Sequence, residues 1–422
     1  MTAMTRQQWT VGIASFVGMT MSAPALLSTT PLLLEPTSRE FGWGRAVLSL
    51  ALLIASPLAA ISYVVIGRLL DAFGARRILI PGYVLCGLSF MLMSRLNGSI
   101  PQLIVLQIAM TLCGTLVTGI AFGNIISRYF STNRGTLLGL CLGAGGGFGM
   151  TVMPLIGATL LEHGGWRLTY FGVGLLAILI GLPAALALPR HQRAGDAAAP
   201  TEVKITSGME GRVAIRSGAY ILMLAATCFT CMVINGIGAH MAAIMTDHGM
   251  SHTAAAAALS VYAGSMMAAQ FAIGILLDRL QTRRIVIPVF GIVLAGVAML
   301  QVSTSAAGLF LGAALIGAGA GSEYGILPYF LTRLFGLRAF GLLYGAIYAI
   351  AAVGTGFGPY TMGKVFDVTG SYDGSLMGFD GVLVLSIVLM LFLPPYRYAT
   401  DGTLLSRDPD PLEPGLALEA KL

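Results

Sequence analysis

The chain has 422 residues, of which 56% are hydrophobic and only 10% are charged. A soluble globular domain carries charge on about a quarter of its residues, so this composition excludes an ordinary soluble protein and requires lipid as the surrounding solvent. The net charge of +6 does not indicate a nucleic-acid partner, because the basic residues lie in loops between apolar runs and not on one face with stacking aromatic side chains.

Apolar runs of helical spanning length recur along the chain, with Gly and Pro inside them, whereas a transmembrane barrel would show alternating segments of about ten residues. The sequence therefore predicts an all-α integral membrane protein with twelve transmembrane helices. The predicted spans cover residues 11–34, 46–66, 77–95, 101–126, 136–160, 168–188, 219–241, 254–277, 285–304, 306–331, 340–363 and 376–394. The first run is too long for the apolar core of a signal peptide and is predicted to be the first helix.

Basic residues gather in the loops after spans two, four, eight and ten. They are Arg68, Arg76, Arg77, Arg128, Arg134, Arg279, Arg283, Arg284, Arg333 and Arg338. Cytoplasmic loops carry the excess of Lys and Arg in membrane proteins. These loops and both termini are therefore predicted to be cytoplasmic, in a multi-pass protein of the plasma membrane, here the bacterial inner membrane.

One long polar stretch divides the chain. The predicted organisation is an N-terminal six-helix bundle (1–189), a cytoplasmic linker (190–217), a C-terminal six-helix bundle (218–395) and a disordered cytoplasmic tail (396–422). The tail carries charges among prolines and cannot bury a core, so it is given no role in function.

The two halves repeat each other. The segment Gly67-Arg-Leu-Leu-Asp-Ala-Phe-Gly-Ala-Arg-Arg-Ile-Leu-Ile-Pro81 recurs as Gly274-Ile-Leu-Leu-Asp-Arg-Leu-Gln-Thr-Arg-Arg-Ile-Val-Ile-Pro288, and Ser127-Arg-Tyr-Phe130 recurs as Thr332-Arg-Leu-Phe335. Such duplication is typical of transporters that rock two bundles about a site at the bilayer midplane. The first of these loops resembles the cytoplasmic signature of the major facilitator superfamily, and the resemblance extends over nearly the whole chain.

In that family, charged residues of this loop hold the halves together when the cytoplasmic side is closed. The resemblance implies a gating role for a set of acidic and basic residues at matching junctions of the two halves. The set is Asp71, Arg76, Arg77, Asp278, Arg283, Arg284, Arg128 and Arg333. The alternative is a solvated turn whose charges complement the helix ends.

Three segments resemble the monocarboxylate and oxalate/formate branch, which moves small organic acids. They are Glu40-Phe-Gly-Trp-Gly-Arg45, Arg128-Tyr-Phe-Ser-Thr-Asn-Arg-Gly135 and Phe335-Gly-Leu-Arg-Ala-Phe-Gly341. Relatives in that branch meet the anion with a cation in the eighth or eleventh span. Here the eighth span has no Lys or Arg and the eleventh has only Lys364 at its outer end, which leaves His240 of the seventh span as the other candidate.

One acid lies well inside a predicted span. Glu323 precedes Arg333 by about 15 Å along a helix, which is half of the roughly 30 Å of hydrocarbon, and an ionisable group at that depth is a functional candidate. A protonated carboxyl group costs less to bury than a charged one, so Glu323 is predicted to take up and release a proton as access alternates. The alignment of the halves pairs Glu323 with Thr118 and Tyr329 with Asn124.

Other polar side chains within the spans can orient a small solute. They are Tyr262, Tyr324, Tyr344, Tyr348, Asn235 and Gln270. For each of them, helix packing with a local hydrogen bond is the alternative role. The five cysteines all lie in predicted spans, and the pair Cys228 and Cys231 is interpreted as apolar packing, with no metal or cofactor expected.

The predicted function is secondary active transport of a small organic acid by alternating access, with a proton as the co-transported ion. The alternatives are a proton-coupled exporter of a neutral or cationic solute and an organic anion exchanger. The expected partners are the organic acid, the proton and the lipid bilayer, and the protein is expected to be a monomer. An enzyme would need paired acids, metal-spaced histidines or a nucleophile with its base, and the spans offer none of these.

Overall fold

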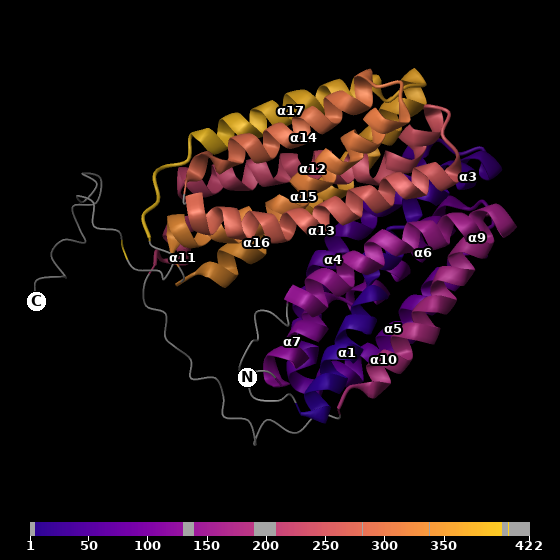
Figure 1. The fold of residues 1–422 in the computed structure, drawn as a ribbon, viewed down its shortest axis with the longest axis horizontal. Coiled ribbons are helices and arrows are strands. Elements are labelled where there is room, and N and C mark those ends of the chain that lie inside the picture. The colour runs from indigo at the N-terminus through magenta and orange to yellow at the C-terminus, as the bar shows by residue number, and fades with distance from the viewer. Residues whose placement is uncertain are drawn as a thin grey trace, which may run out of the picture.

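The computed structural model describes residues 5–129, 139–189, 208–280, 282–336, 338–398 and 404. Figure 1 shows two bundles of helices, one formed by α1 to α10 and the other by α11 to α17. In the described ranges, ten helical stretches are long and apolar enough to cross a membrane. One of them, Leu140–Ala187, contains two helices, and the shorter apolar helix Val286–Val302 adds a further crossing, so the predicted all-α membrane fold is confirmed.

The elements follow each other in the order of the predicted spans. The N-terminal bundle contains α1 (Arg6–Thr20), α2 (Ala23–Leu27), α3 (Thr30–Phe41), α4 (Arg45–Phe73), α5 (Ala75–Met93), α6 (Ile100–Thr115), α7 (Gly119–Tyr129), η1 (Gly139–Ala144), α9 (Gly145–Leu176), η2 (Ala177–Gly181) and α10 (Leu182–Ala187). The C-terminal bundle contains α11 (Gly211–Ile215), α12 (Gly218–Asp247), α13 (His252–Leu280), η3 (Arg283–Ile285), α14 (Val286–Val302), α15 (Ala306–Phe335), α16 (Phe340–Thr369) and α17 (Asp373–Leu391).

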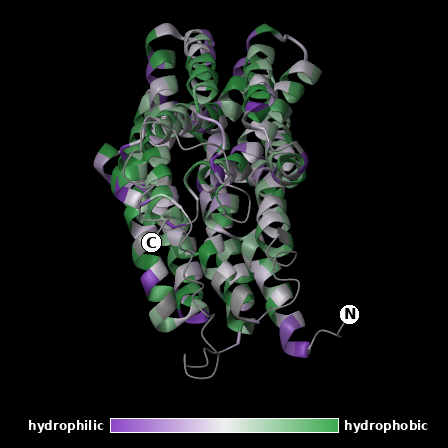
Figure 2. Cartoon of the chain, turned by 90° about the vertical axis from the view of Figure 1, so that its left-hand side faces the viewer, coloured by the Kyte–Doolittle hydropathy of each residue, from purple (hydrophilic) through white to green (hydrophobic). Residues whose placement is uncertain are grey.

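The surface of the bundles is apolar in the way that lipid requires. Figure 2 shows hydrophobic residues along most of each helix. Large apolar side chains such as Val105, Leu179 and Ile275 are exposed. Water would penalise such a surface, whereas hydrocarbon does not, so the outer faces of the helices are suited to contact acyl chains.

The first crossing is not the single helix predicted over 11–34. It is broken into α1, α2 and α3, and it continues to Phe41. Pro24 and Pro31 each lie in the first turn of the helix that follows a break. Proline has no N–H to continue a preceding helix, but it fits the first turn of a new one, which explains both interruptions.

The fourth crossing is also broken, although the sequence predicted one helix over 101–126. It consists of α6 and α7, and the residues between them form shorter-range turns. The carbonyl oxygen of Val117, left free by this break, accepts a hydrogen bond of 3.1 Å from the N–H of Ala23. The breaks in the first and fourth crossings therefore satisfy each other's backbone groups, as hydrocarbon demands.

The fifth and sixth crossings meet at a glycine corner. Gly164 and Gly165 are non-helical within the stretch of α9, and Gly165 has a φ of 67°. A positive φ is disfavoured for residues with a Cβ, so glycine permits the chain to turn here. The predicted start of the fifth span at 136 falls in residues 130–138, which lie outside the described residues.

The connection between the bundles lies partly outside the described residues, which resume at Gly208. From there the chain packs on the C-terminal bundle. The N–H of Met209 donates to the carbonyl oxygen of Phe335 at 2.8 Å, and Ala214 of α11 is fully buried. Beyond α17, Tyr398 still donates its N–H to Arg333, past the predicted start of the tail at 396. Residues 399–403 and 405–422 of that tail lie outside the described residues.

Glycines allow α12 and α16 to approach closely. A Cβ built on Gly358 of α16 would collide with the carbonyl oxygen of Met232 and approach the backbone nitrogen of Gly236 within 3.0 Å. Small residues that bring helix backbones together are a common basis of helix association in lipid. This contact therefore holds the inner pair of the C-terminal bundle.

We predict that Gly358→Ala destabilises the protein. Alanine favours a helix by about 1 kcal/mol, but the clash with a backbone that cannot move costs about 1–3 kcal/mol. The net effect is a lower midpoint of thermal unfolding in detergent. Gly378→Ala in α17 is the matched control, because a Cβ there meets nothing within 4 Å. Equal midpoints for the two variants would contradict the predicted clash.

Candidate functional site

The two bundles touch at one end and separate toward the other. Figure 1 shows them together near α3 and α9, and apart near α7 and α11. The joined end carries the turns around Gly42, Gly249 and Gly370, which connect consecutive crossings. The inter-bundle hydrogen bonds that the described side chains form lie at this joined end.

Arg45, the first residue of α4, is the centre of this junction. Its guanidinium group donates to both carboxylate oxygens of Asp247 at the end of α12, at 2.7 and 2.9 Å. It also donates to the hydroxyl oxygen of Tyr372 at 2.7 Å and lies 3.7 Å from the ring centroid of Phe366. A two-point ion pair stacked on an aromatic ring uses the planar geometry that distinguishes Arg from Lys.

Asp367 adds a second attachment to the same turn. Its carboxylate accepts hydrogen bonds from the N–H groups of Arg45 and Ala46, at 2.7 and 3.0 Å. These groups belong to the free donors at the start of α4, so a carboxylate from α16 of the other bundle caps this helix. Gly44 leaves room for it, because a Cβ there would collide with the Asp367 carboxylate.

His240 completes the junction from within α12. The ring is fully buried, with Nδ1 2.7 Å from the Tyr372 hydroxyl and Nε2 3.0 Å from the carbonyl oxygen of Pro359 and 3.2 Å from Oγ of Ser49. We call the group formed by Arg45, His240, Asp247, Asp367 and Tyr372 the latch. The sequence predicted His240 as a substrate or proton ligand, and the structure includes it in this inter-bundle network.

A second line of contact joins η1 and α9 to α13. The hydroxyl of Thr253 donates to the carboxylate of Glu162 at the joined end. Further along, a Cβ on Gly147 would collide with the side chain of Met267, and one on Gly143 would lie 3.4 Å from the ring of Phe271. Small residues again allow close approach, here between helices of different bundles.

Glu323 lies in α15 and is buried, with 8% of its surface exposed. Its Oε1 is 3.6 Å from the thiol sulfur of Cys231 in α12, which donates to it. The side chain of Asn235, one turn further along α12, donates to the carbonyl oxygen of Cys231 at 2.9 Å. The sequence interpretation of Cys231 as plain packing was therefore incomplete, because its thiol contacts the predicted proton site.

Two further predicted ligands have described contacts near helix crossings. Thr118 is buried and donates to the carbonyl oxygen of Thr115, within the break between α6 and α7. Tyr262 of α13 lies beside α12, since a Cβ on Gly238 would be 3.6 Å from its hydroxyl. Gln270, also on α13, is half-buried.

The remaining predicted ligands are not brought to Glu323 by any described contact. The ring of Tyr344 stacks on Phe340 with centroids 5.2 Å apart, and the ring of Tyr329 meets that of Tyr396 at 6.0 Å. The side chains of Asn124, Tyr324 and Tyr348 lie outside the description, so their roles stay predictions.

The predicted cytoplasmic gating residues, where described, contact their own bundle. Arg76 donates to the carbonyl oxygen of Leu188 at 2.7 Å. Arg333 is buried beneath the ring of Tyr396, 4.8 Å from its centroid. Arg77 and Arg284 are exposed. The side chains of Asp71, Arg128, Asp278 and Arg283 are outside the described set, and Arg134 is outside the described residues.

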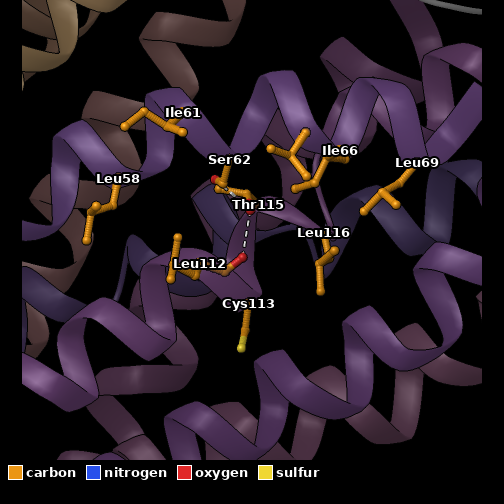
Figure 3. A pocket seen from close by; sticks show the side chains of 10 residues that line it. Leu58, Ile61, Ser62, Ile66, Leu69, Leu112, Cys113, Thr115 and Leu116 are labelled. Atoms are coloured by element: carbon orange, nitrogen blue, oxygen red, sulfur yellow. Dashed lines mark hydrogen bonds between the residues drawn. The ribbon is translucent and has the colours of Figure 1, made fainter.

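A pocket of about 420 Å³ lies between α4 and α6, away from Glu323 (Figure 3). Its lining is almost entirely apolar, with Leu58, Ile61, Leu112 and others projecting toward it. The hydroxyl of Ser62 is turned to Oγ1 of Thr115, at 3.1 Å. Such a lining suits a hydrocarbon group, and its described residues include no charged side chain that could bind a carboxylate.

Sequence reasoning missed most of the latch. Arg45 was noticed only as part of a family-like segment, and Asp247, Asp367 and Tyr372 were not noticed at all. Charged residues at the outer ends of apolar spans are usual in membrane proteins, and nothing in a single sequence pairs residues from different halves. Asp380 was missed as well; it lies in α17 and accepts from Gln301 of α14 at 2.6 Å.

Comparisons with known proteins agree with this architecture. The family model described as Major Facilitator Superfamily matches residues 9–359 and 223–418. No curated protein matches the sequence. A solved bacterial homologue of the human lysosomal transporter Spinster, inward-facing and unoccupied, has a TM-score of 0.66 at 16% identity, covering 93% of this chain and 95% of that one. A mutant of the nucleoside transporter NupG has a TM-score of 0.72 at 12% identity, covering 92% and 100%. At such identities the likeness concerns the fold alone.

We predict that Asp367→Ala loosens the joined end. Losing a helix cap costs about 1 kcal/mol, which corresponds to a roughly five-fold shift in a two-state equilibrium. Spin labels on Asn97→Cys and Thr304→Cys, in a background without the native cysteines, report the separation of the bundles at this end. Asp373→Ala is the control, since Asp373 accepts a hydrogen bond from Ser371 of its own turn. A distance distribution unchanged by Asp367→Ala would contradict the capping role.

Proposed function

Because this chain belongs to the Major Facilitator Superfamily and is a transporter rather than an enzyme, we propose that it carries a small organic acid together with a proton by alternating access. The observation that carries this proposal is Glu323, buried in α15 with a thiol and no described cation as its hydrogen-bond partner. A carboxyl group buried without a counter-cation is stable when it holds a proton. Such a group suits the coupling of proton movement to a conformational cycle.

The organic acid is the solute that this arrangement serves most directly. Protonated Glu323 donates a hydrogen bond to the carboxylate of the solute, so that acid and proton move as one neutral unit. The resemblance of Glu40–Arg45 and two other segments to the monocarboxylate and oxalate/formate branch supports this substrate class. Tyr262 and Asn235, from α13 and α12, are proposed to orient the solute near Glu323.

The separated end is proposed to face the cytoplasm of a bacterial inner membrane. The basic residue Arg68 lies near the end of α4, and Arg76 and Arg77 lie in the first turn of α5, which follows it. Cytoplasmic loops and the helix ends beside them carry such an excess. In this orientation the latch closes the outer side. Both termini would then be cytoplasmic, and the protein works as a monomer in the lipid bilayer.

A neutral or cationic solute exported in exchange for protons is the second candidate. The apolar pocket between α4 and α6 and the lack of Lys and Arg in α13 before Asp278 favour it. An ionised Glu323 would attract a cation, and the pocket, which lies apart from it, offers an apolar surface to a neutral solute. Exchange of organic anions is a third candidate, and the buried acid disfavours it.

Uptake into proteoliposomes separates these candidates. Purified protein is tested with a panel of radiolabelled organic acids under an imposed pH gradient, inside alkaline, and in vesicles without a gradient. We expect at least one acid to accumulate, and only with the gradient. If no acid accumulates and a lipophilic cation is moved against the proton gradient instead, the exporter replaces the symporter as the function.

We predict that Glu323→Gln abolishes gradient-driven accumulation while acid exchange between the two sides continues. The amide keeps the shape and hydrogen bonding of the carboxyl group but cannot carry a proton. Asp380→Asn is the matched control, because that acid pairs with Gln301 at the contact of α14 and α17 and should leave accumulation intact. Full pH-driven accumulation by Glu323→Gln would show that this residue does not couple transport to the proton.

A further inference from the structure

The hydrogen bonds around His240 specify where its proton resides. The carbonyl oxygen of Pro359 only accepts, so the Nε2 atom 3.0 Å away must carry a hydrogen. Oγ of Ser49, also near Nε2, donates its own hydrogen to the carbonyl oxygen of Arg45 at 3.2 Å and is left as a second acceptor. Both neighbours of Nε2 are therefore acceptors, and Nε2 must carry the hydrogen of the neutral ring.

The other ring nitrogen, Nδ1, must carry no hydrogen. The guanidinium of Arg45 can only donate, so the Tyr372 hydroxyl accepts from it at 2.7 Å. The hydroxyl's own hydrogen then points to Nδ1 of His240, also at 2.7 Å, and Nδ1 must offer a lone pair. The closed latch thus requires a neutral imidazole, and the hydroxyl of Tyr372 relays this requirement to Arg45.

We propose that His240 is a proton-operated switch of the latch, which keeps the joined end open while the ring is protonated. A proton added to the Nδ1 lone pair produces an imidazolium ion whose new N–H faces the Tyr372 hydroxyl. That hydroxyl must turn its hydrogen away, and its oxygen is then shared between two cationic donors. The hydrogen bond that the Tyr372 hydroxyl donates to Nδ1 is lost, which breaks the relay between His240 and Arg45.

The charges around the ring reinforce this effect. From α4, Arg45 brings a positive charge against the same hydroxyl, and it repels the imidazolium ion. The acids that reach the latch are Asp247 of α12 and Asp367 of α16. The first is paired with the Arg45 guanidinium, and the second caps α4. Each of these carboxylates is already bound, and neither forms a described bond to the ring.

Burial makes the switch directional. The ring is fully enclosed while the latch is closed, so it can exchange protons with the medium only after the joined end has opened. Once protonated, the ring must lose its proton before the latch can close again. Acid on the side of the joined end therefore holds the bundles apart there, and alkaline medium lets them close. This behaviour requires no bound solute, so it is independent of what the protein carries.

The test measures the distance between spin labels at Asn97→Cys and Thr304→Cys in lipid nanodiscs at about pH 8 and about pH 5.5, on either side of the usual titration range of histidine. We expect the ratio of long to short distances to rise on the order of five-fold or more in acid. No response to pH in this parent protein overturns the proposal.

Two variants assign the response to the ring. In His240→Gln, which cannot titrate in this range, the distribution is expected to be the same at both pH values; a full response there overturns the proposal. Asp373→Asn is the control for titration of a carboxylate outside the latch, because Asp373 accepts a hydrogen bond from Ser371 of its own turn, and it should keep the pH response. Should His240→Gln fail to fold, Tyr372→Phe removes the hydroxyl relay, and its response must then fall clearly below that of the parent. A full response in Tyr372→Phe also overturns the proposal.

Discussion

The polar bonds between the two bundles are concentrated, among the described residues, at the first turn of one helix, α4. Arg45 supplies a guanidinium group to Asp247 and two backbone N–H groups of this turn bind Asp367, so both acids of the latch bind within one turn. Lipid gives apolar surfaces no reason to associate, and polar bonds with close helix contacts must hold the halves. Bonds of this kind form and break as units, which suits a junction that has to open repeatedly.

Hydropathy was sufficient to predict the helices, because hydrocarbon leaves a spanning backbone few alternatives. The breaks after α1 and α6 were not predicted, since the apolar pattern continues across them and only the partnership of Ala23 with Val117 makes the second one stable. Glu323 was recognisable as the acid in a long apolar stretch. Its partner Cys231 was not, because a cysteine in an apolar helix looks the same whether it faces lipid or an acid. Arg45 and Asp367 are 322 residues apart in the sequence, and nothing local marks them as partners.

Two kinds of surface coexist in this protein. Near Glu323 the helices α12 and α15 bring together a carboxyl group, a thiol and an amide, whereas the pocket between α4 and α6 is lined by leucine and isoleucine side chains (Figure 3). The fold is common to the solved transporters with which it was compared, at identities of 16% and 12%. The fold therefore does not by itself specify a solute, and the polar cluster and the apolar pocket are two features that differ in the chemistry they offer.

The paired breaks in the first and fourth crossings form a hinge within the N-terminal bundle. The segments on one side of the breaks, α1 and α7, pack against each other, and the bond from Ala23 to Val117 joins the residues at the pivot. A continuous helix resists bending because each turn is hydrogen-bonded to the next. The first and fourth crossings lack some of these backbone hydrogen bonds at their breaks, which lie beside each other. The ends of this bundle at the separated side can therefore tilt as a pair while the turn that bears Arg45 stays in place. Closure of that side then does not require the whole bundle to rotate as one solid body.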